Sequence, residues 1–225
     1  MTLAEIQDRV LSWAGVPDRR EWLLAARREH FGREGEPHEE DKSFELRMNR
    51  LLDYYVYDFL PNGVDTTLEL FLKEGGGELT TDERAEVREV GRGRRGLYEV
   101  RRIRSGEIRV RDAFTGDEWN VVERRMAVGL VKGDLIEARL LSHGGRLHFS
   151  PAFLFHPREV RKRILGEVRR RLKAAGTAGT ADVAGLLARL SRMGLRLERY
   201  RNVRVESIYD FDSPDPSVPP RSDGV

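Results

Sequence analysis

Arginines dominate the side chains of this sequence that could act on a ligand. The 225 residues include no cysteine, which excludes a cysteine nucleophile, a thiolate zinc site and a disulfide within the chain. The five histidines contain no pair at the i, i+4 spacing of a helical metal site, and no GxSxG motif marks a serine nucleophile. We therefore predict no catalytic residue, no metal site and no cofactor. An enzymatic activity stays open but unsupported.

Two acidic features each have a functional and a structural interpretation. Asp112 shares the apolar face of the alternating segment 108–114, where a raised pKa would suit an acid or base. Thr115-Gly116 follows directly, so we favour the interpretation that Asp112 caps this turn. His38 precedes three acidic residues that could hold a cation, but a solvated loop is the simpler explanation.

The charge of the chain is strongly polarised along its length. The net charge of +2 combines −9 over residues 1–90, +11 over 91–173 and 0 over 174–225. This asymmetry favours an anionic partner for the middle of the chain. Because 35 of the 40 basic residues are arginine, the coding bias of a GC-rich genome remains an alternative explanation.

The segment GRGRRG at 91–96 resembles no nucleotide-binding motif. It lacks the GK[ST] ending of a P-loop, and it precedes a predicted strand rather than a helix. Both a flexible hinge and a basic, phosphate-contacting loop stay open. If the positive charge is functional, we expect the surface to combine the 91–104 arm, outward barrel arginines and one helical face. The candidate residues are Arg92, Arg94, Arg95, Arg109, Arg111, Arg158, Lys162, Arg169 and Lys173.

The first ninety residues have the 3.6-residue period of helices. Threonine or aspartate followed by glutamate three residues later predicts helix starts at Thr2, Asp18, Thr66 and Thr80. Gly32 is expected to end the second helix, and a third is expected over about 42–60. The aromatic run at 54–59 is predicted to pack in the core rather than to stack on bases, because neighbouring helical residues point in different directions.

After residue 96 the apolar period changes to two, which indicates strands. Ile136, Ala138 and Leu140 share one face, whereas Glu137 and Arg139 point the opposite way. Turn dipeptides separate five such runs within about sixty residues, which predicts a small closed barrel of SH3-like or OB type. Trp119 is expected to be buried inside this barrel.

The helical period returns at Pro157. Val160, Ile164, Val168 and Leu172 are expected to form the buried stripe, with the four candidate cations from Arg158 to Lys173 within an arc of about 60° on another face. We expect a hinge at 177–182, then a helix capped by Thr180 and ended by Gly194. The segment 195–211 is expected to be extended, and the proline-rich residues 213–225 to form a disordered tail.

Residues 51–141 resemble an uncharacterised group of bacterial proteins, some of which carry a SEC-C metal-binding tail. The matching pieces are YYVYD at 54–58, TTLELFL at 66–72, Glu83-Arg84, GLYEV at 96–100, VRDAFTG at 110–116 and KGDLIEARL at 132–140. The resemblance implies a helical segment followed by a small β-barrel and brings no activity. Without cysteine, this chain lacks the SEC-C tail.

The sequence therefore predicts an α+β protein with a helical region at 1–90, a five-stranded barrel at 91–156 and C-terminal helices at 157–212. We expect a non-catalytic nucleic-acid-binding protein, associated with RNA or the ribosome, in the cytoplasm. The alternative is a protein-interaction adaptor whose acidic helical part and basic barrel part face different partners or each other. No segment of about 18 apolar residues is present, and we expect no membrane partner.

Overall fold

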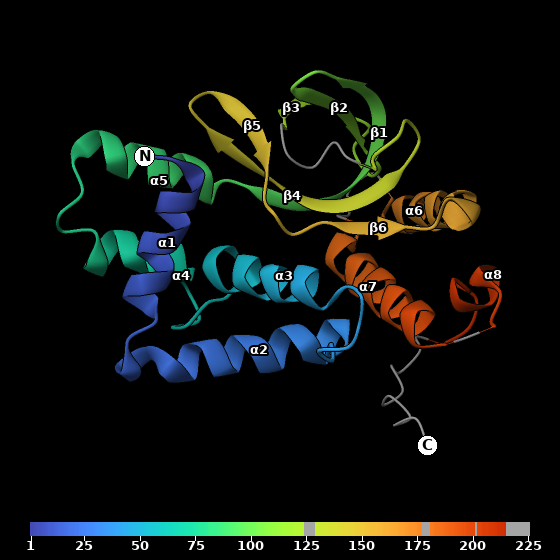
Figure 1. The fold of residues 1–225 in the computed structure, drawn as a ribbon, viewed down its shortest axis with the longest axis horizontal. Helices are drawn as coiled ribbons and strands as arrows, with labels where there is room; N and C mark the ends of the chain where they lie inside the picture. The colour runs from blue at the N-terminus through green and yellow to red at the C-terminus, as the bar shows by residue number, and fades with distance from the viewer. Residues whose placement is uncertain (124–128, 177–180, 201, 215–225) are drawn as a thin grey trace.

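The computed structural model describes residues 1–123, 129–176, 181–200 and 202–214. Its helices are α1 (Leu3–Ala14), α2 (Arg20–Glu34), α3 (Phe44–Tyr57), α4 (Thr67–Leu70), α5 (Thr81–Gly91), α6 (Arg161–Ala175), α7 (Val183–Arg199) and α8 (Val205–Ile208). Its strands are β1 (Arg94–Arg104), β2 (Glu107–Asp112), β3 (Glu118–Val122), β4 (Leu135–His143), β5 (Arg146–Phe149) and β6 (Leu154–His156). The predicted α+β class is confirmed (Figure 1).

Three of the predicted helix starts are confirmed as capping boxes, in which a threonine hydroxyl and a glutamate carboxylate accept each other's backbone N–H groups. They are Thr2 with Glu5, Thr66 with Glu69, and Thr80 with Glu83. The fourth is wrong, because Pro17–Arg19 form a short 3-10 turn and α2 begins at Arg20. The predicted end at Gly32 is also wrong. Helix α2 continues to Glu34 and ends at Gly35, whose φ of 87° suits a glycine.

The strands form a closed five-stranded barrel, as the sequence predicted. The hydrogen-bonded order is β1-β2-β3-β5-β4, and β4 pairs back with β1 to close it. The β3–β5 pair is parallel and the other pairs are antiparallel. The short strand β6 pairs with Leu135–Glu137 of β4, along the edge whose other end pairs with β5. The long strand β1 pairs with β2 along one part and with β4 along another, which is the arrangement of the OB-fold. Of the two predicted barrel types, the OB type is therefore observed.

The barrel rests on the helical layer through β4. In Figure 1 the barrel lies above α3 and α7, and α2 lies on the far side of α3. The aromatic residues of α3 and its end are buried as predicted, namely Tyr54, Tyr55, Tyr57 and Phe59. Strand β4 has the barrel interior on one side and the helices on the other, and it is buried along both faces from Leu135 to Leu141. Its charged residues therefore lie against the helices.

Trp119 departs from the sequence expectation, because it is only partly buried. It is the second residue of β3, at the end of the barrel, where its ring lies edge-on to Tyr98 with 6.2 Å between centroids. The guanidinium of Arg94 lies 4.6 Å above the same ring.

This position lowers the expected cost of removing Trp119. We expect Trp119→Ala to reduce the free energy of unfolding by about 1–2 kcal/mol, because only part of the ring leaves water on folding. The matched variant Phe153→Ala, at a fully buried ring of the same core, should cost about 3–5 kcal/mol. Urea melts of the two variants measure the difference. Equal losses would contradict the partial burial of Trp119.

The C-terminal part contains several departures from the sequence expectations. Leu172 is exposed, because it lies in the last turn of α6, beyond the packed residues Val160, Ile164 and Val168.

Asp182 caps α7 by accepting the Gly185 N–H at 2.8 Å, whereas Thr180 and most of the predicted hinge lie outside the described residues. Gly194 does not end α7, and helix rather than extended chain follows it, because the buried Met193 and Leu195 keep this turn in the core. Residues 215–225 of the predicted tail also lie outside the described ranges.

Within the described residues, none of the helices has the length and apolar character needed to cross a membrane.

Candidate functional site

The candidate cations fall into three groups in the structure. Arg95 points into a buried ionic cluster between the barrel and the helices. Three more are exposed, but each lies near a carboxylate. The distances are 3.6 Å from Arg94 to Asp112, 2.8 Å from Arg109 to Glu118 and 2.6 Å from Arg158 to Asp134. The remaining five are exposed and have no ion-pair partner among the described residues; they are Arg92, Arg111, Lys162, Arg169 and Lys173.

Two further exposed cations lie on β1, within the predicted 91–104 arm. Arg102 and Arg104 point outward, and neither has an ion-pair partner in the part of the chain that the structure describes. A register shift between Val100 and Arg102 alters the alternation of β1.

A chain of ion pairs joins α6 to the outside of the barrel. Arg161 of α6 contacts Glu99 of β1 at 2.6 Å, and Glu99 contacts Arg101 at 3.0 Å. Arg101 then lies 3.6 Å from Glu118 of β3, which also pairs with Arg109 of β2. These pairs place the start of α6 beside the outer side of β1 and β3. We call the outer sides of β1, β2, β3 and α6 together the β1–β3/α6 face.

The buried ionic cluster has a different character. Arg50 of α3 contacts Glu34 at 2.7 Å and Glu137 of β4 at 2.5 Å, and Arg95 contacts the same two carboxylates. Glu137 is fully buried, and Arg50 and Glu34 are almost so. Two guanidinium groups and two carboxylates therefore neutralise each other at the junction of α2, α3, β1 and β4.

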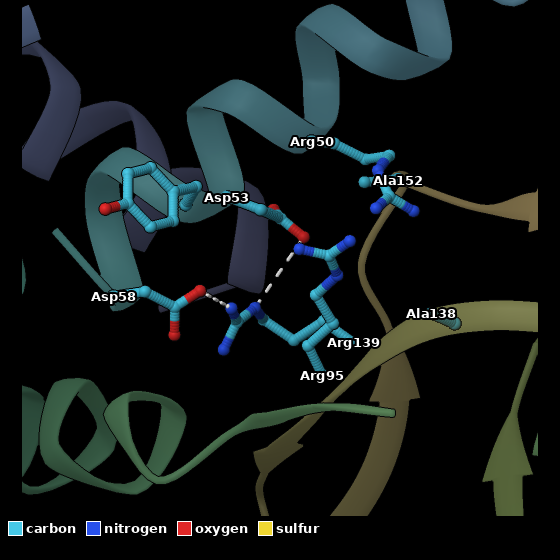
Figure 2. A pocket seen from close by; sticks show the side chains of 8 residues that line it. Arg50, Asp53, Asp58, Arg95, Ala138, Arg139 and Ala152 are labelled. Atoms are coloured by element: carbon cyan, nitrogen blue, oxygen red, sulfur yellow. Dashed lines mark hydrogen bonds and ion pairs between the residues drawn. The ribbon is translucent and has the colours of Figure 1, made fainter. Parts of the chain in front are cut away.

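A second set of charged groups lies beside this cluster. Figure 2 shows Asp53 and Asp58, from α3 and its end, facing the barrel residues Arg95 and Arg139 around a small cavity of about 10 Å³. Arg139 pairs with Asp58 and donates to the Gly93 carbonyl at 3.1 Å. Asp53 accepts a hydrogen bond from the Ser150 hydroxyl at 2.5 Å.

Burial shifts the pKa values of these carboxyl groups. It raises the pKa of Glu137 to about 8, with a further upward push from Glu34 and an opposing one from Arg95. The pKa of Glu34 falls below its usual value; its burial acts upward, and the largest opposing influence is the charge of Arg95, which also donates a hydrogen bond to it. Because the two carboxyl groups share the same guanidinium partners, the protonation of one depends on that of the other. Burial also raises the pKa of Asp53 to about 6.

One structural interpretation from the sequence can be checked here. Asp112 accepts the backbone N–H groups of Phe114 at 2.7 Å and Thr115 at 3.1 Å, so it caps the turn as predicted. Over the described ranges, no three His, Asp or Glu side chains gather as a metal site would require.

Of three comparisons with known proteins, one found a match. No curated protein and no solved structure matches the chain. One family model, described as a family of unknown function (DUF7986), matches residues 35–182. This range extends from the loop after α2 through the barrel and α6. It contains residues 51–141, whose motifs resemble an uncharacterised family. The chain therefore belongs to the DUF7986 family, whose function is unknown.

Proposed function

We propose that this protein binds nucleic acid without catalysis, through the β1–β3/α6 face. The observation that carries the proposal is the difference between buried and exposed cations. Arg50, Arg95 and Arg139, at the junction with the helices, each contact a carboxylate. Within the part of the chain that the structure describes, Arg111, Lys162, Arg169 and Lys173 do not. Internal pairing thus accounts for the buried cations but leaves the exposed ones available to an anionic partner.

The barrel type supports the same proposal. OB-folds present strands β2 and β3 and their neighbouring loops to oligonucleotides, and Arg109 and Arg111 lie on β2 here. The fold alone is an analogy, because one fold serves many functions. The charge pattern supplies the independent support, since each phosphate contact by a cation releases condensed counterions.

The finer parts of the proposal rest on the sequence. We propose an RNA or ribosome-associated role, a cytoplasmic location and a bacterial origin, the last from the motif resemblance. The adaptor function is the second candidate. It is favoured by the pairs of Arg95 with Glu34 and of Arg139 with Asp58, through which the acidic helices neutralise part of the basic barrel.

Salt dependence of binding tests the nucleic-acid proposal. We expect labelled single- or double-stranded RNA or DNA to bind in fluorescence anisotropy, with a log–log salt slope of about −3 to −4 for about four phosphate contacts. The combined variant R111Q, K162Q, R169Q and K173Q should remove most of this slope. All four side chains are exposed, so the fold should be preserved.

A variant with the same change in net charge serves as the control. Arg20, Arg28, Lys42 and Arg88 are exposed cations of the helical part, and their replacement by glutamine should leave the slope nearly unchanged. Equal weakening by both variants would show that net charge rather than this face matters. If no probe binds below about 100 μM at low salt, the protein is weaker than ordinary non-specific binders, and the adaptor function replaces this proposal.

A further inference from the structure

A cleft of about 660 Å³ lies where α2, α3, the start of β1 and α7 meet. This volume falls within the range of about 300–1,000 Å³ that small-molecule sites occupy, and such sites favour the junctions between parts of a fold. None of the four cations in the combined variant above lines the cleft. The cleft is therefore distinct from the surface that this variant alters, although Arg94 at the start of β1 lines it.

One wall of the cleft is aromatic and apolar. The ring of His30 stacks on Tyr54 with 5.1 Å between centroids and an interplanar angle of 28°. Val183 and Leu187 of α7 line the cleft as well. His30 is buried, and burial lowers its pKa to about 4, so the ring is neutral near pH 7. This wall suits a flat, uncharged ring system.

The inner charges of the cleft already have partners. Arg95 is held by Glu34 and Glu137, and Arg139 by Asp58. Asp182, at the start of α7, pairs with Arg171 at 3.1 Å. Each carboxylate that lines the cleft therefore lies beside a guanidinium, which limits its repulsion of an entering anion.

Two further guanidinium groups in the cleft lining form only weak ion pairs. Arg33 pairs with Glu29 at 2.9 Å, but both side chains are about half exposed, and such pairs contribute little in water. Arg94 lies 3.6 Å from Asp112, beyond hydrogen-bond distance, and its side chain is 51% exposed. Arg33 also donates a hydrogen bond to the Tyr54 hydroxyl at 2.8 Å, and the Arg94 guanidinium lies 4.6 Å above the Trp119 ring. Turning either group towards an anion exchanges these contacts but breaks no buried ion pair.

We propose that this cleft binds a small phosphate ester with a planar ring, of nucleoside monophosphate size. The ring lies against His30, Tyr54 and the α7 residues, and Arg33 and Arg94 contact the phosphate. Arginine suits this task because its planar fork matches phosphate oxygens with two parallel hydrogen bonds. The proposal goes beyond the nucleic-acid function and does not depend on it.

Calorimetry and thermal melts with the four common nucleoside monophosphates test the proposal. We expect at least one of them to bind at one site with a Kd below about 1 mM and to raise the melting temperature. It should bind at least about tenfold more tightly than its nucleoside or inorganic phosphate alone, since the site holds both parts of the ligand. Equal binding of inorganic phosphate alone would overturn the proposal, because it would show an anion site without a ring site.

Two variants locate the binding. Arg33→Gln combined with Arg94→Gln should weaken the monophosphate about tenfold or more while leaving the nucleoside nearly unaffected. Ala184→Trp should block both, because Ala184 is an exposed residue of the cleft wall and a large ring there fills the space. The combined variant of the β1–β3/α6 face should bind the monophosphate normally, which separates this proposal from the nucleic-acid one. Absence of binding by all four monophosphates, or unchanged binding by Ala184→Trp, would refute the site.

Discussion

Replacing Arg95 with methionine is expected to lower the free energy of unfolding by about 3–5 kcal/mol, the cost of breaking a buried ion pair. Arg95 contacts both Glu34 and Glu137. Among the described residues, its removal leaves Arg50 as the one guanidinium that contacts either of them. Methionine fills much of the volume of the arginine stem, so the loss reports mainly on charge. Urea melts near pH 7 measure it.

An exposed pair of similar length provides the control. Arg27 contacts Glu36 at 2.6 Å, and both side chains are more than half exposed. Arg27→Met should therefore cost no more than about 1 kcal/mol, because water screens such a pair. The same substitution thus compares two ion pairs that differ mainly in burial.

A double variant separates charge from packing. Adding Glu137→Leu to Arg95→Met removes the guanidinium together with a carboxyl group that it contacts, and retains the pair of Arg50 with Glu34 at 2.7 Å. Because apolar residues often replace buried ion pairs without loss, this double variant should be more stable than Arg95→Met alone. A double variant that is less stable than Arg95→Met would show that lost packing, and not an unpaired carboxylate, causes the effect.

Local signals in the sequence were sufficient for most of the helices and strands. The capping boxes at Thr2, Thr66 and Thr80 involve residues only three apart, so the chain forms them without help from distant parts. The alternation of β4 also correctly assigns Ile136, Ala138 and Leu140 to the inside of the barrel. Both kinds of signal are contained within one element.

The buried ionic cluster could not be predicted from these signals. Alternation places Glu137 and Arg139 on the outer face of β4, which in a free-standing barrel would be in water. In the structure α3 covers that face, and both residues are buried. The alternation of a strand shows to which face a side chain points. Which element covers that face depends on contacts between residues far apart in the sequence, such as Arg50 and Glu137.

The same limitation explains the mixed outcome for the candidate cations. Helical spacing grouped Arg158 with Lys162, Arg169 and Lys173, but Arg158 pairs with Asp134, which precedes β4. Helix ends were misplaced for a related reason. Glycine signals at Gly32 and Gly194 were overridden because residues beyond them, Glu34 and Leu195, are buried in tertiary contacts.

Acidification should destabilise the wild-type protein relative to a His156→Phe variant. His156 is buried, with its Nδ1 atom 3.4 Å from the Tyr209 hydroxyl and its Nε2 atom without a hydrogen-bond partner. Burial, with a smaller contribution from Arg47, lowers the pKa of His156 to about 3. Phenylalanine retains the edge-to-face contact with Tyr209 but does not titrate.

The sign of the effect follows from proton linkage. In the unfolded chain His156 takes up a proton below about pH 6.5, whereas in the folded protein it stays neutral down to about pH 3. Its contribution to stability is therefore complete above about pH 6.5 and is lost as the pH falls towards 3. Glu137 and Asp53, with raised pKa values, act in the opposite direction on acidification, and both are present in wild type and variant.

The difference between the two proteins isolates the histidine. From about pH 7 to pH 4.5, the stability of His156→Phe relative to wild type should rise by about 2–3 kcal/mol, at about 1.4 kcal/mol per pKa unit. Urea melts at the two pH values measure this change. His38→Phe, at an exposed loop position, should retain the pH dependence of the wild type. A difference between wild type and His156→Phe that does not vary with pH would mean that His156 is protonated in the folded protein, and that the core around Tyr209 admits charge.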